Sequence, residues 1–384
     1  MPQTSGDRPR FLGSPLAALG WSAHWEDALA LLTASITTDR DSESLEAGRV
    51  LSTARDALRV GTRAGEEAAL VPGRLLYEAA SPAELPCAGD WVALRRAGGP
   101  VDVDGPLLVE AVLPRASVFV RRAAGRRSEP QALAANVDLA LLVSALDEDW
   151  SRRRLERWLA LAREAGVPPV VVLTKADLCA DPSAVAQAAG EVASAAAGGP
   201  VAACVVDAIR GDGVEALRSR LAPGATVVLL GSSGVGKSTL ANRLAGREVA
   251  ATGTVAGDGR GRHTTSRREL MALPGGALLL DTPGLREVGL WLGDEDLASV
   301  FPEIEALARH CRFRDCTHER EPGCAVRAAV AAGELDPDRV ASLRQLTAER
   351  EALRRRTDGG AARAAKQKVR ALHRAARKHR PREM

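Results

Sequence analysis

The chain has 384 residues and a formal net charge of +3 at pH 7, with 46% hydrophobic but only 3% aromatic side chains. This length predicts two or three domains with apolar cores. No run of eighteen apolar residues occurs, and the N-terminus lacks an apolar signal core, so we expect a cytoplasmic protein rather than a membrane or secreted one.

The first part of the chain is expected to hold a long lead-in and a small barrel. Residues 1–46 precede the barrel. Short strands bounded by Gly, Pro and charged residues are predicted near Ala57–Val60, Ala68–Tyr77, Asp90–Arg95 and Leu107–Val112. Closely spaced short strands fit an OB-fold, a barrel that often binds nucleic acid. Its candidate stacking aromatics, each equally suited to a core position, are Tyr77, Trp91 and Phe119.

Two segments are strongly basic. An arginine cluster stands at the exit of the predicted barrel and consists of Arg115, Arg121, Arg122, Arg126 and Arg127. From Arg350 to the end, the chain contains thirteen Lys and Arg residues but only three Asp and Glu residues. Such segments favour contact with RNA phosphates, the alternative being a solvated helix that only improves solubility.

The segment Thr174-Lys175-Ala176-Asp177 follows an apolar strand pattern that begins at Val170. The carboxylate of Asp177 can accept hydrogen bonds from the N1–H and the exocyclic amine of guanine, which adenine cannot supply. Lys175 can cover the base with its aliphatic stem. Alone, this pattern also fits a solvated loop, so it gains meaning only beside a phosphate-binding loop.

A phosphate-binding loop does follow, between the apolar strand pattern Thr226–Leu230 and a predicted helix. Glycines in such a loop let backbone N–H groups point at phosphate oxygens. Lys237 is expected to reach the β- and γ-phosphates, and the Ser238 hydroxyl to bind Mg²⁺. The loop residues are Gly231, Ser232, Ser233, Gly234, Val235, Gly236, Lys237, Ser238 and Thr239.

Two further segments complete the pattern of a GTPase. Asp281-Thr282-Pro283-Gly284 follows an apolar strand pattern, which would bring Asp281 to the magnesium ion and Gly284 to the γ-phosphate. The Gly-rich segment 252–266 resembles a switch loop, although by itself it also fits a linker. It contains His263, Thr264 and Thr265, and Thr265 offers a hydroxyl to Mg²⁺.

The order of these motifs is unusual, because the guanine loop precedes the phosphate loop. A circular permutation of the α/β sheet explains this order, since strands can keep their places in space while the chain enters elsewhere. The permutation places the switch segment at the end of the GTPase unit. Whatever follows Gly284 is therefore attached directly to the part that responds to hydrolysis.

A cluster of metal ligands comes next, with three cysteines and one histidine at Cys311, Cys316, His318 and Cys324. This is the closed Cys₃His set of structural zinc, without an open position for catalysis. The alternative is three free cysteines and a surface histidine. The other cysteines are isolated and expected to be packing residues: Cys87, Cys179 and Cys204.

These motifs together resemble the RsgA (YjeQ) family, the small-subunit-dependent GTPases of bacterial ribosomes, over about residues 47–350. Leu113–Arg115 and Ala134–Asp138 also resemble this family. The resemblance implies an N-terminal OB-fold, a central α/β circularly permuted P-loop GTPase and a C-terminal α-helical zinc-binding domain. The expected ranges are 1–46 for an extension that contacts the ribosome, 47–122 for the OB-fold, 123–293 for the GTPase, 294–350 for the zinc-binding domain and 351–384 for the basic tail.

Three positions bear on recognition and turnover. The segment Val206–Gly213 corresponds to the second loop that contacts guanine in this family, called here the second guanine loop. Asp207 stands where the family usually has serine, while Ala208 can still offer its backbone N–H to the base oxygen. Leu285 stands where Ras-like enzymes carry a water-positioning glutamine, so we expect slow intrinsic hydrolysis. His263 is the candidate to position water, or else it stabilises the loop or contacts RNA.

The expected function is GTP hydrolysis in late maturation of the small ribosomal subunit, with binding to its rRNA and subunit-stimulated turnover and release. We expect a monomer with one structural Zn²⁺, and Mg²⁺ bound with GTP. The catalytic residues are expected to be Lys237, Ser238, His263, Thr264, Thr265, Asp281 and Gly284, and the Mg²⁺ ligands Ser238, Thr265 and Asp281. The alternatives are an RNA-binding regulator that uses GTP as an occupancy signal and a GTPase that carries zinc.

Overall fold

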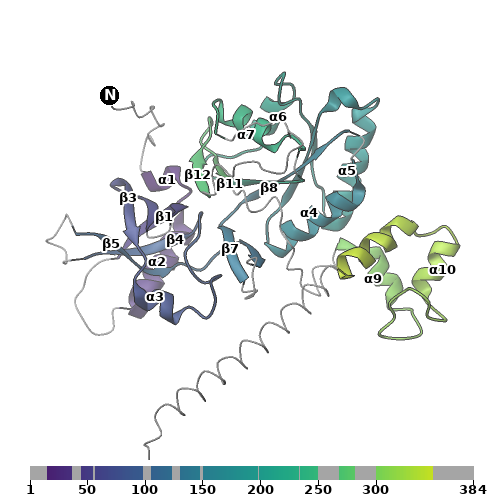
Figure 1. Cartoon of the computed structure of the whole chain (residues 1–384), viewed down its shortest axis with the longest axis horizontal. Coiled ribbons are helices and arrows are strands. Elements are labelled where there is room, and N and C mark those ends of the chain that lie inside the picture. The colour runs from purple at the N-terminus through teal and green to yellow at the C-terminus, as the bar shows by residue number, and fades with distance from the viewer. Residues whose placement is uncertain are drawn as a thin grey trace, which may run out of the picture.

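The computed structural model describes residues 15–36, 45–54, 57–97, 105–122, 130–147, 150–197, 199–232, 234–249, 268–281 and 300–348. Figure 1 shows a small barrel with its helices, a larger α/β part, and a small helical part beside helix α4. Among the described residues, one sheet has the strand order β10-β9-β8-β11-β13-β12-β1-β2-β3-β5-β4, and a β1–β4 pairing closes its last five strands into a barrel. None of the helices in these ranges is long and apolar enough to cross a membrane.

The barrel consists of β1 (Glu46–Thr53), β2 (Leu58–Thr62), β3 (Gly65–Leu70), β4 (Trp91–Arg96) and β5 (Leu107–Val112). Its neighbours pair antiparallel except for β3 and β5, which are parallel. Alternate residues of the strands point inward and bury an aliphatic core that includes Val50, Val60, Val92 and Val109. The closed five-stranded barrel confirms the predicted N-terminal OB-fold.

One segment of the barrel differs from its prediction. Ala68–Tyr77 was expected to be a strand, but β3 ends at Leu70 and a short helix, α3 (Gly73–Glu78), follows. The physical reason is Pro72, which has no N–H for a strand ladder and whose φ of −64° suits the start of a helix. Tyr77 is 91% exposed on this helix, so it is not a core residue.

Two helices of the N-terminal extension pack against the barrel. They are α1 (Pro15–Ala18) and α2 (Ala23–Ile36). Leu19 is buried, and its Cδ1 lies so close to Gly61 that a Cβ there would approach within 2.4 Å. Trp21 meets the buried Trp91 edge to face, with 4.7 Å between ring centroids. This part of the extension is therefore a lid of the barrel, which the sequence patterns did not indicate.

The α/β part contains the expected P-loop sheet in permuted order. Its strands are β8 (Leu139–Ala145), β9 (Pro169–Thr174), β10 (Ala203–Val205), β11 (Thr226–Leu230), β12 (Glu269–Ala272) and β13 (Leu278–Asp281). All neighbouring pairs are parallel except β12–β13. Strand β11 lies between β8 and β13 although two strands of the same sheet, β9 and β10, come between β8 and β11 in the chain.

Helices cover both faces of this sheet (Figure 1). They are α4 (Arg152–Glu164) and α5 (Pro182–Ala197) on one face, and α6 (Val214–Arg218) and α7 (Lys237–Ala245) on the other. Successive strand residues alternate between the two cores: Leu142 packs in the cluster of α4 and α5, and Leu141 in that of α6 and α7. Such strands, buried on both faces, explain the near-continuous apolar runs in the sequence.

A separate two-stranded sheet, β6 (Val118–Arg122) and β7 (Pro130–Ala135), connects the barrel to the α/β part. The buried Phe119 belongs to the same core as α4, and the Val118 N–H donates to the Ala165 carbonyl at 3.3 Å. Strand β6 therefore lies outside the barrel, although the expected OB-fold range 47–122 includes it. It leaves the barrel because its ladder partner is β7 rather than β5.

A single buried arginine joins the barrel, its helical lid and the α/β part. The Arg49 guanidinium donates to the carbonyls of Leu19 at 2.6 Å, Gly89 at 3.0 Å and Asn136 at 3.0 Å, and to Thr226 Oγ1 at 2.9 Å. Burial lowers the pKa of Arg49 to about 10, so it stays charged at neutral pH. These bonds fix the three pieces relative to one another.

The C-terminal part includes α9 (Pro302–Ala308) and α10 (Ala325–Ala331), and residues 337–348 are also helical. A buried ionic network fastens it to α4. Arg339, only 4% exposed, pairs with Glu156 and Glu303 and lies 4.6 Å from the Phe301 ring centroid. The Ser342 hydroxyl donates to the other oxygen of Glu156 at 2.5 Å. The chain from Val300 onward is thus anchored on the α/β part.

Replacing Arg339 by methionine is expected to loosen this attachment by about 3–5 kcal/mol, because Glu156 would keep a buried charge without its main partner. The measurement is amide hydrogen exchange of α4 and residues 300–348. The double variant Arg339→Met with Glu156→Gln should recover most of the loss, since the buried charge is removed with its partner. The control is Arg309→Met, which breaks an exposed pair with Glu305 and should cost below about 1 kcal/mol.

Candidate nucleotide site and metal centre

The phosphate loop joins the end of β11 to the start of α7. Gly231, Gly234 and Gly236 all have positive φ, at 153°, 84° and 90°. A Cβ at Gly231 would lie 2.3 Å from the Val143 carbonyl oxygen, so only glycine fits against β8 there. Ser238 and Thr239 lie in the first turn of α7, and Ser233 falls outside the described residues.

Lys237 lies over this loop with its side chain buried. Its ammonium donates to the Gly231 carbonyl at 2.8 Å and also to the Ser232 carbonyl. The side chain is 6% exposed, so the charge is held inside the curl of the loop. This arrangement brings a cation to the N-terminus of α7, where the helix dipole also favours an anion.

The predicted guanine loop follows β9 and contacts the phosphate loop directly. The Thr174 hydroxyl donates to the Val235 carbonyl at 2.6 Å. Lys175 has a left-handed backbone, with φ 55°, and its ammonium pairs with Asp147 at 2.9 Å. Asp177 is exposed in the short helix η1 (Ala176–Leu178). The two loops are therefore in direct contact, and within the described part of the chain the Asp177 carboxylate has no hydrogen-bond partner.

In the second guanine loop, Asp207 supplies the hydrogen bonds that shape the turn. Its carboxylate accepts from the backbone N–H groups of Arg210 at 2.9 Å and Ile209 at 2.8 Å. These bonds, that of Arg210 first, hold the pKa of Asp207 below its usual value. An aspartate thus closes this loop as an Asx turn, a role that serine fills more weakly. The departure from the family pattern leaves the loop well defined.

The carboxyl ends of β9, β11 and β13 lie at one edge of the sheet because these strands run parallel. In open α/β sheets this carboxyl edge is where ligands bind. Asp281 ends β13 and stands at this edge next to the phosphate loop. Four other predicted residues lie outside the described residues: His263, Thr264, Thr265 and Gly284. Their roles stay predictions.

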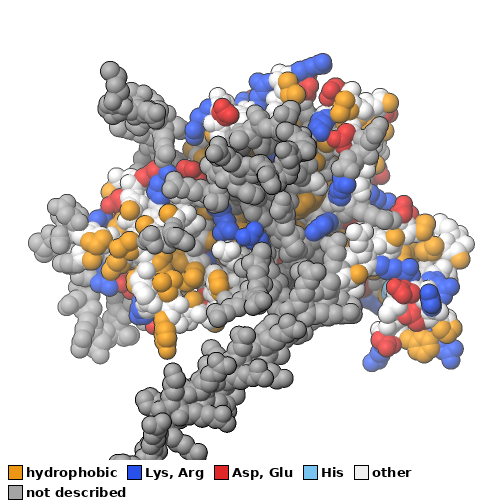
Figure 2. Space-filling model, viewed as in Figure 1, with side chains coloured by type: hydrophobic (Ala, Val, Ile, Leu, Met, Phe, Trp, Pro, Cys, Tyr) orange, Lys and Arg blue, Asp and Glu red, His pale blue; other side chains and the backbone are white. Residues whose placement is uncertain are grey.

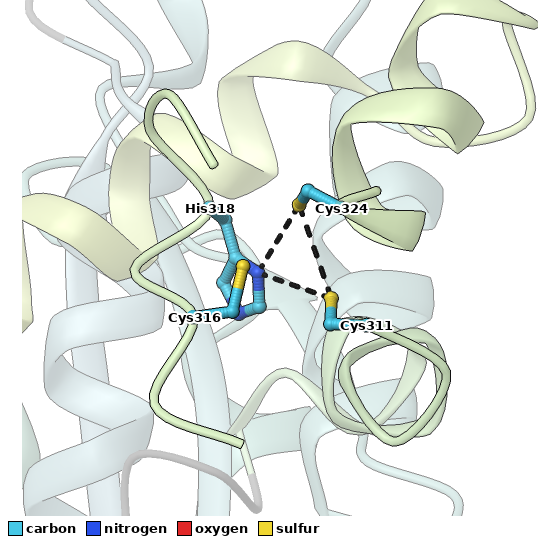
Figure 3. A group of neighbouring side chains, drawn as sticks. All are labelled: Cys311, Cys316, His318 and Cys324. Atoms are coloured by element: carbon cyan, nitrogen blue, oxygen red, sulfur yellow. Dashed lines mark hydrogen bonds between the residues drawn. The ribbon is translucent and has the colours of Figure 1, made fainter. Parts of the chain in front are cut away.

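The predicted metal ligands meet in one cluster. Figure 3 shows Cys311, Cys316, His318 and Cys324 with their sulfur and nitrogen atoms turned toward one another, and their ligand atoms all lie within 4.8 Å. The His318 Nδ1 is 3.6 Å from the Cys311 sulfur and 3.5 Å from that of Cys324, and these two sulfurs are 3.9 Å apart. A zinc tetrahedron with Zn–S bonds of about 2.3 Å has sulfur–sulfur edges of about 3.8 Å. The donor set and its spacing fit a tetrahedral metal ion.

Exposed arginines lie on this C-terminal part among acidic side chains, as the blue and red patches at the lower right of Figure 2 show. The exposed arginines are Arg309, Arg312, Arg314, Arg320, Arg327 and Arg344. In contrast, Arg115 of the predicted barrel-exit cluster is not available to RNA. It makes two 2.7 Å bonds to the buried Asp90 and is a structural residue. The segment 350–384 lies outside the described residues.

Sequence reasoning missed three arginines that hold the site and its surroundings together. Arg49 and Arg339 join the parts of the chain, and Arg243 joins α7 to the second guanine loop at the Ala208 carbonyl, at 2.9 Å. Each is a lone arginine within an ordinary strand or helix pattern. No local signal distinguishes such a residue from a surface arginine, because its partners are distant in the chain.

Comparisons with known proteins agree with this architecture. Residues 112–291 match the family model described as RsgA GTPase. A protein named small ribosomal subunit biogenesis GTPase RsgA from Opitutus terrae is 47% identical over 357 residues, which cover 91% of this chain and 93% of that one. Its namesake from Streptomyces avermitilis is 46% identical over 347 residues, covering 90% and 88%.

Two solved structures share the fold. YjeQ from Thermotoga maritima has a TM-score of 0.56 at 25% identity, covering 80% of this chain and 98% of that one. YloQ, a circularly permuted GTPase, has a TM-score of 0.54 at 23% identity, covering 82% and 98%. With the permuted sheet, the phosphate loop and the extent of these matches in view, the chain belongs to the RsgA GTPase family.

Proposed function

We propose that this chain binds GTP at the carboxyl edge of its permuted sheet and hydrolyses it to GDP and phosphate. The observation that carries this proposal is the contact between the two predicted loops, Thr174 Oγ1 to the Val235 carbonyl at 2.6 Å. This contact holds the guanine loop and the phosphate loop close enough to bind the base and the phosphates of one nucleotide. Asp177 selects guanine, and the Ala208 N–H meets the base oxygen.

The phosphate side of the site provides charge stabilisation. Lys237 transfers its hydrogen bonds from loop carbonyls to the β- and γ-phosphates, which are stronger acceptors because they are charged. Ser238, Asp281 and Thr265 are the proposed Mg²⁺ ligands, and a bound Mg²⁺ would neutralise charge on the phosphates. Gly284 contacts the γ-phosphate, Thr264 belongs to the same switch loop, and His263 positions water.

The proposed setting is late maturation of the small ribosomal subunit in the cytoplasm, with rRNA as partner and the protein as a monomer. Relatives that cover nine-tenths of this chain are named for small-subunit biogenesis. The exposed arginines of the C-terminal part and the basic segment from Arg350 onward supply charge for RNA phosphates. Residues 1–46 are proposed to contact the ribosome as well.

The proposed domain ranges are 1–46 for the extension, 47–122 for the OB-fold together with the connecting strand β6, 123–293 for the GTPase, 294–350 for the zinc-binding domain and 351–384 for the basic tail. The metal at the Cys₃His cluster is proposed to be structural zinc. A carrier would need an open, exchangeable position, whereas four protein ligands complete a tetrahedron. The remaining alternative is an RNA-binding regulator in which GTP only signals occupancy and hydrolysis is incidental.

The test is GTP hydrolysis by the purified protein, with and without small ribosomal subunits, and with ATP as the control nucleotide. We expect slow turnover alone and stimulation by small subunits of at least about tenfold, restricted to GTP. Large subunits serve as the matched RNA control. Turnover that small subunits leave unchanged would contradict the proposed setting, and equal hydrolysis of ATP would contradict the guanine site.

A further inference from the structure

One arginine links the helix of the phosphate loop to the second guanine loop. Arg243 lies in the last turn of α7, and its guanidinium reaches two consecutive carbonyls. The Nε donates to the Ala208 carbonyl at 2.9 Å, and an Nη donates to the Ile209 carbonyl. The planar fork also lies against Gly211, where a Cβ would stand 3.7 Å from the Arg243 Cζ. Such a two-point contact suits the geometry of arginine and not that of lysine.

Within residues 207–211, every N–H group except that of Ala208 is paired inside the turn. The N–H groups of Ile209 and Arg210 donate to the Asp207 carboxylate, and that of Gly211 donates to the Asp207 carbonyl at 2.7 Å. Within the described part of the chain, the N–H of Ala208 has no hydrogen-bond partner. Ala208 itself is 9% exposed, and an unpaired backbone donor in such a position is costly unless a ligand uses it.

The direction of this donor is set from both sides of Ala208. Asp207 fixes the peptide that carries the Ala208 N–H, and Arg243 fixes the following peptide through its carbonyl. With both neighbouring peptides held, the Ala208 backbone cannot rotate to turn the N–H away. Because Arg243 belongs to α7, which begins at Lys237, the donor is also held at a constant separation from the phosphate loop.

We propose that Arg243 is a specificity-positioning residue that aims the Ala208 N–H at O6 of guanine. This inference rests on the proposed guanine site. Guanine presents an acceptor at this position, whereas adenine presents an amino group, a donor that would face another donor. A site built to hydrogen-bond one group rejects the analogue that cannot pair, provided that the site is held rigid. Arg243 supplies that rigidity without touching the nucleotide.

The experiment compares the dissociation constants of GDP, 6-thio-GDP and ADP for the full chain and for Arg243→Ala. The sulfur of 6-thioguanine is a weaker hydrogen-bond acceptor than O6, while the N1–H and amino group that Asp177 reads are unchanged. Losing one well-aimed hydrogen bond should weaken GDP binding about tenfold. For 6-thio-GDP we expect the variant to lose less than about threefold in affinity. The ratio of the ADP to the GDP dissociation constant should fall by about tenfold from wild type to variant.

The matched control is Arg218→Ala. Arg218 donates from α6 to the carbonyls of Arg243 at 2.6 Å and Leu244 at 3.2 Å, and no bond of its own reaches the guanine loop. Its loss is expected to change the three constants by a common factor. Arg243→Lys, which keeps the charge without the fork, serves if the alanine variant does not fold, and should lie between wild type and alanine.

The outcomes separate this inference from the proposed function. If Arg243→Ala or Arg243→Lys leaves GDP binding unchanged, or weakens GDP and 6-thio-GDP by the same factor, Arg243 is only a packing residue and the inference is wrong. If the wild-type chain binds ADP as tightly as GDP, the guanine site itself is wrong, and the inference is lost with it. A selective loss for GDP supports both.

Discussion

Removing the metal ion from the Cys₃His cluster is expected to unfold the C-terminal helical part while the barrel and the α/β sheet remain folded. The segment 309–324 that contains the ligands has no helix or strand, and its one buried residue is the ligand Cys324. A structural zinc site supplies roughly 10–16 kcal/mol of apparent binding free energy, so the metal ion is expected to hold this segment and α10 in place. Amide exchange in α10 should accelerate at least about 100-fold after chelation.

The variant Cys324→Ser makes the same test without a chelator. Cys324 caps α10 by accepting the Arg327 N–H at 3.4 Å, and serine can accept this bond but is a poor zinc ligand. Metal analysis should find about one zinc per wild-type chain and much less in the variant. Cys204→Ser, in β10, is the matched control and should keep its zinc. Undisturbed exchange in α10 of the metal-free chain would show that the cluster is not a structural site.

Replacing Lys237 by methionine is expected to lower kcat for GTP by roughly 10²–10³-fold, the usual loss when one preorganised donor to transition-state charge is removed. Methionine has a similar length and tolerates the 6% exposure of this position, so the fold should persist. The measurement is single-turnover hydrolysis at saturating GTP.

The control for this variant is Arg220→Met, which removes an exposed cation from the same part of the chain. Its kcat should stay within about twofold of wild type. Thermal denaturation of both variants checks that the fold is intact. A folded Lys237→Met chain with nearly full kcat would exclude Lys237 from catalysis and would move the proposed chemistry to another group.

The sequence predicted the parts of the site that depend on local chemistry. Gly231 is required because a Cβ would collide with Val143, and Lys237 follows at a fixed distance along the same loop. The four metal ligands lie within fourteen positions, so their spacing alone indicated a cluster, which the structure confirms as a spatial group. Motifs of this kind are short, and their residue types are set by the ligand rather than by the surrounding fold.

The contacts that position the site were not predictable in the same way. Arg243 and Ala208 are 35 positions apart, and Arg339 and Glu156 are 183 apart. Each pairing is decided by the folded arrangement, and the residues themselves look like ordinary helix formers. The wrong prediction of a strand at Ala68–Tyr77 has another origin. Apolar residues such as Leu75 and Leu76 suit a strand as well as a helix, and Pro72 is the one signal in this segment that the strand ends and a helix begins.

The buried Arg49 has a consequence for the synthesis of this protein. Its partner Thr226 lies 177 positions later in the chain. At a translation rate of about 5–20 residues per second, Thr226 is synthesised roughly 10–35 s after Arg49. Until then the guanidinium can bond the Leu19 and Gly89 carbonyls, but not the strand that precedes the phosphate loop. One donor of the Arg49 guanidinium therefore stays hydrated in the nascent barrel, and the first residue of β11 pairs with it just before the phosphate loop is made.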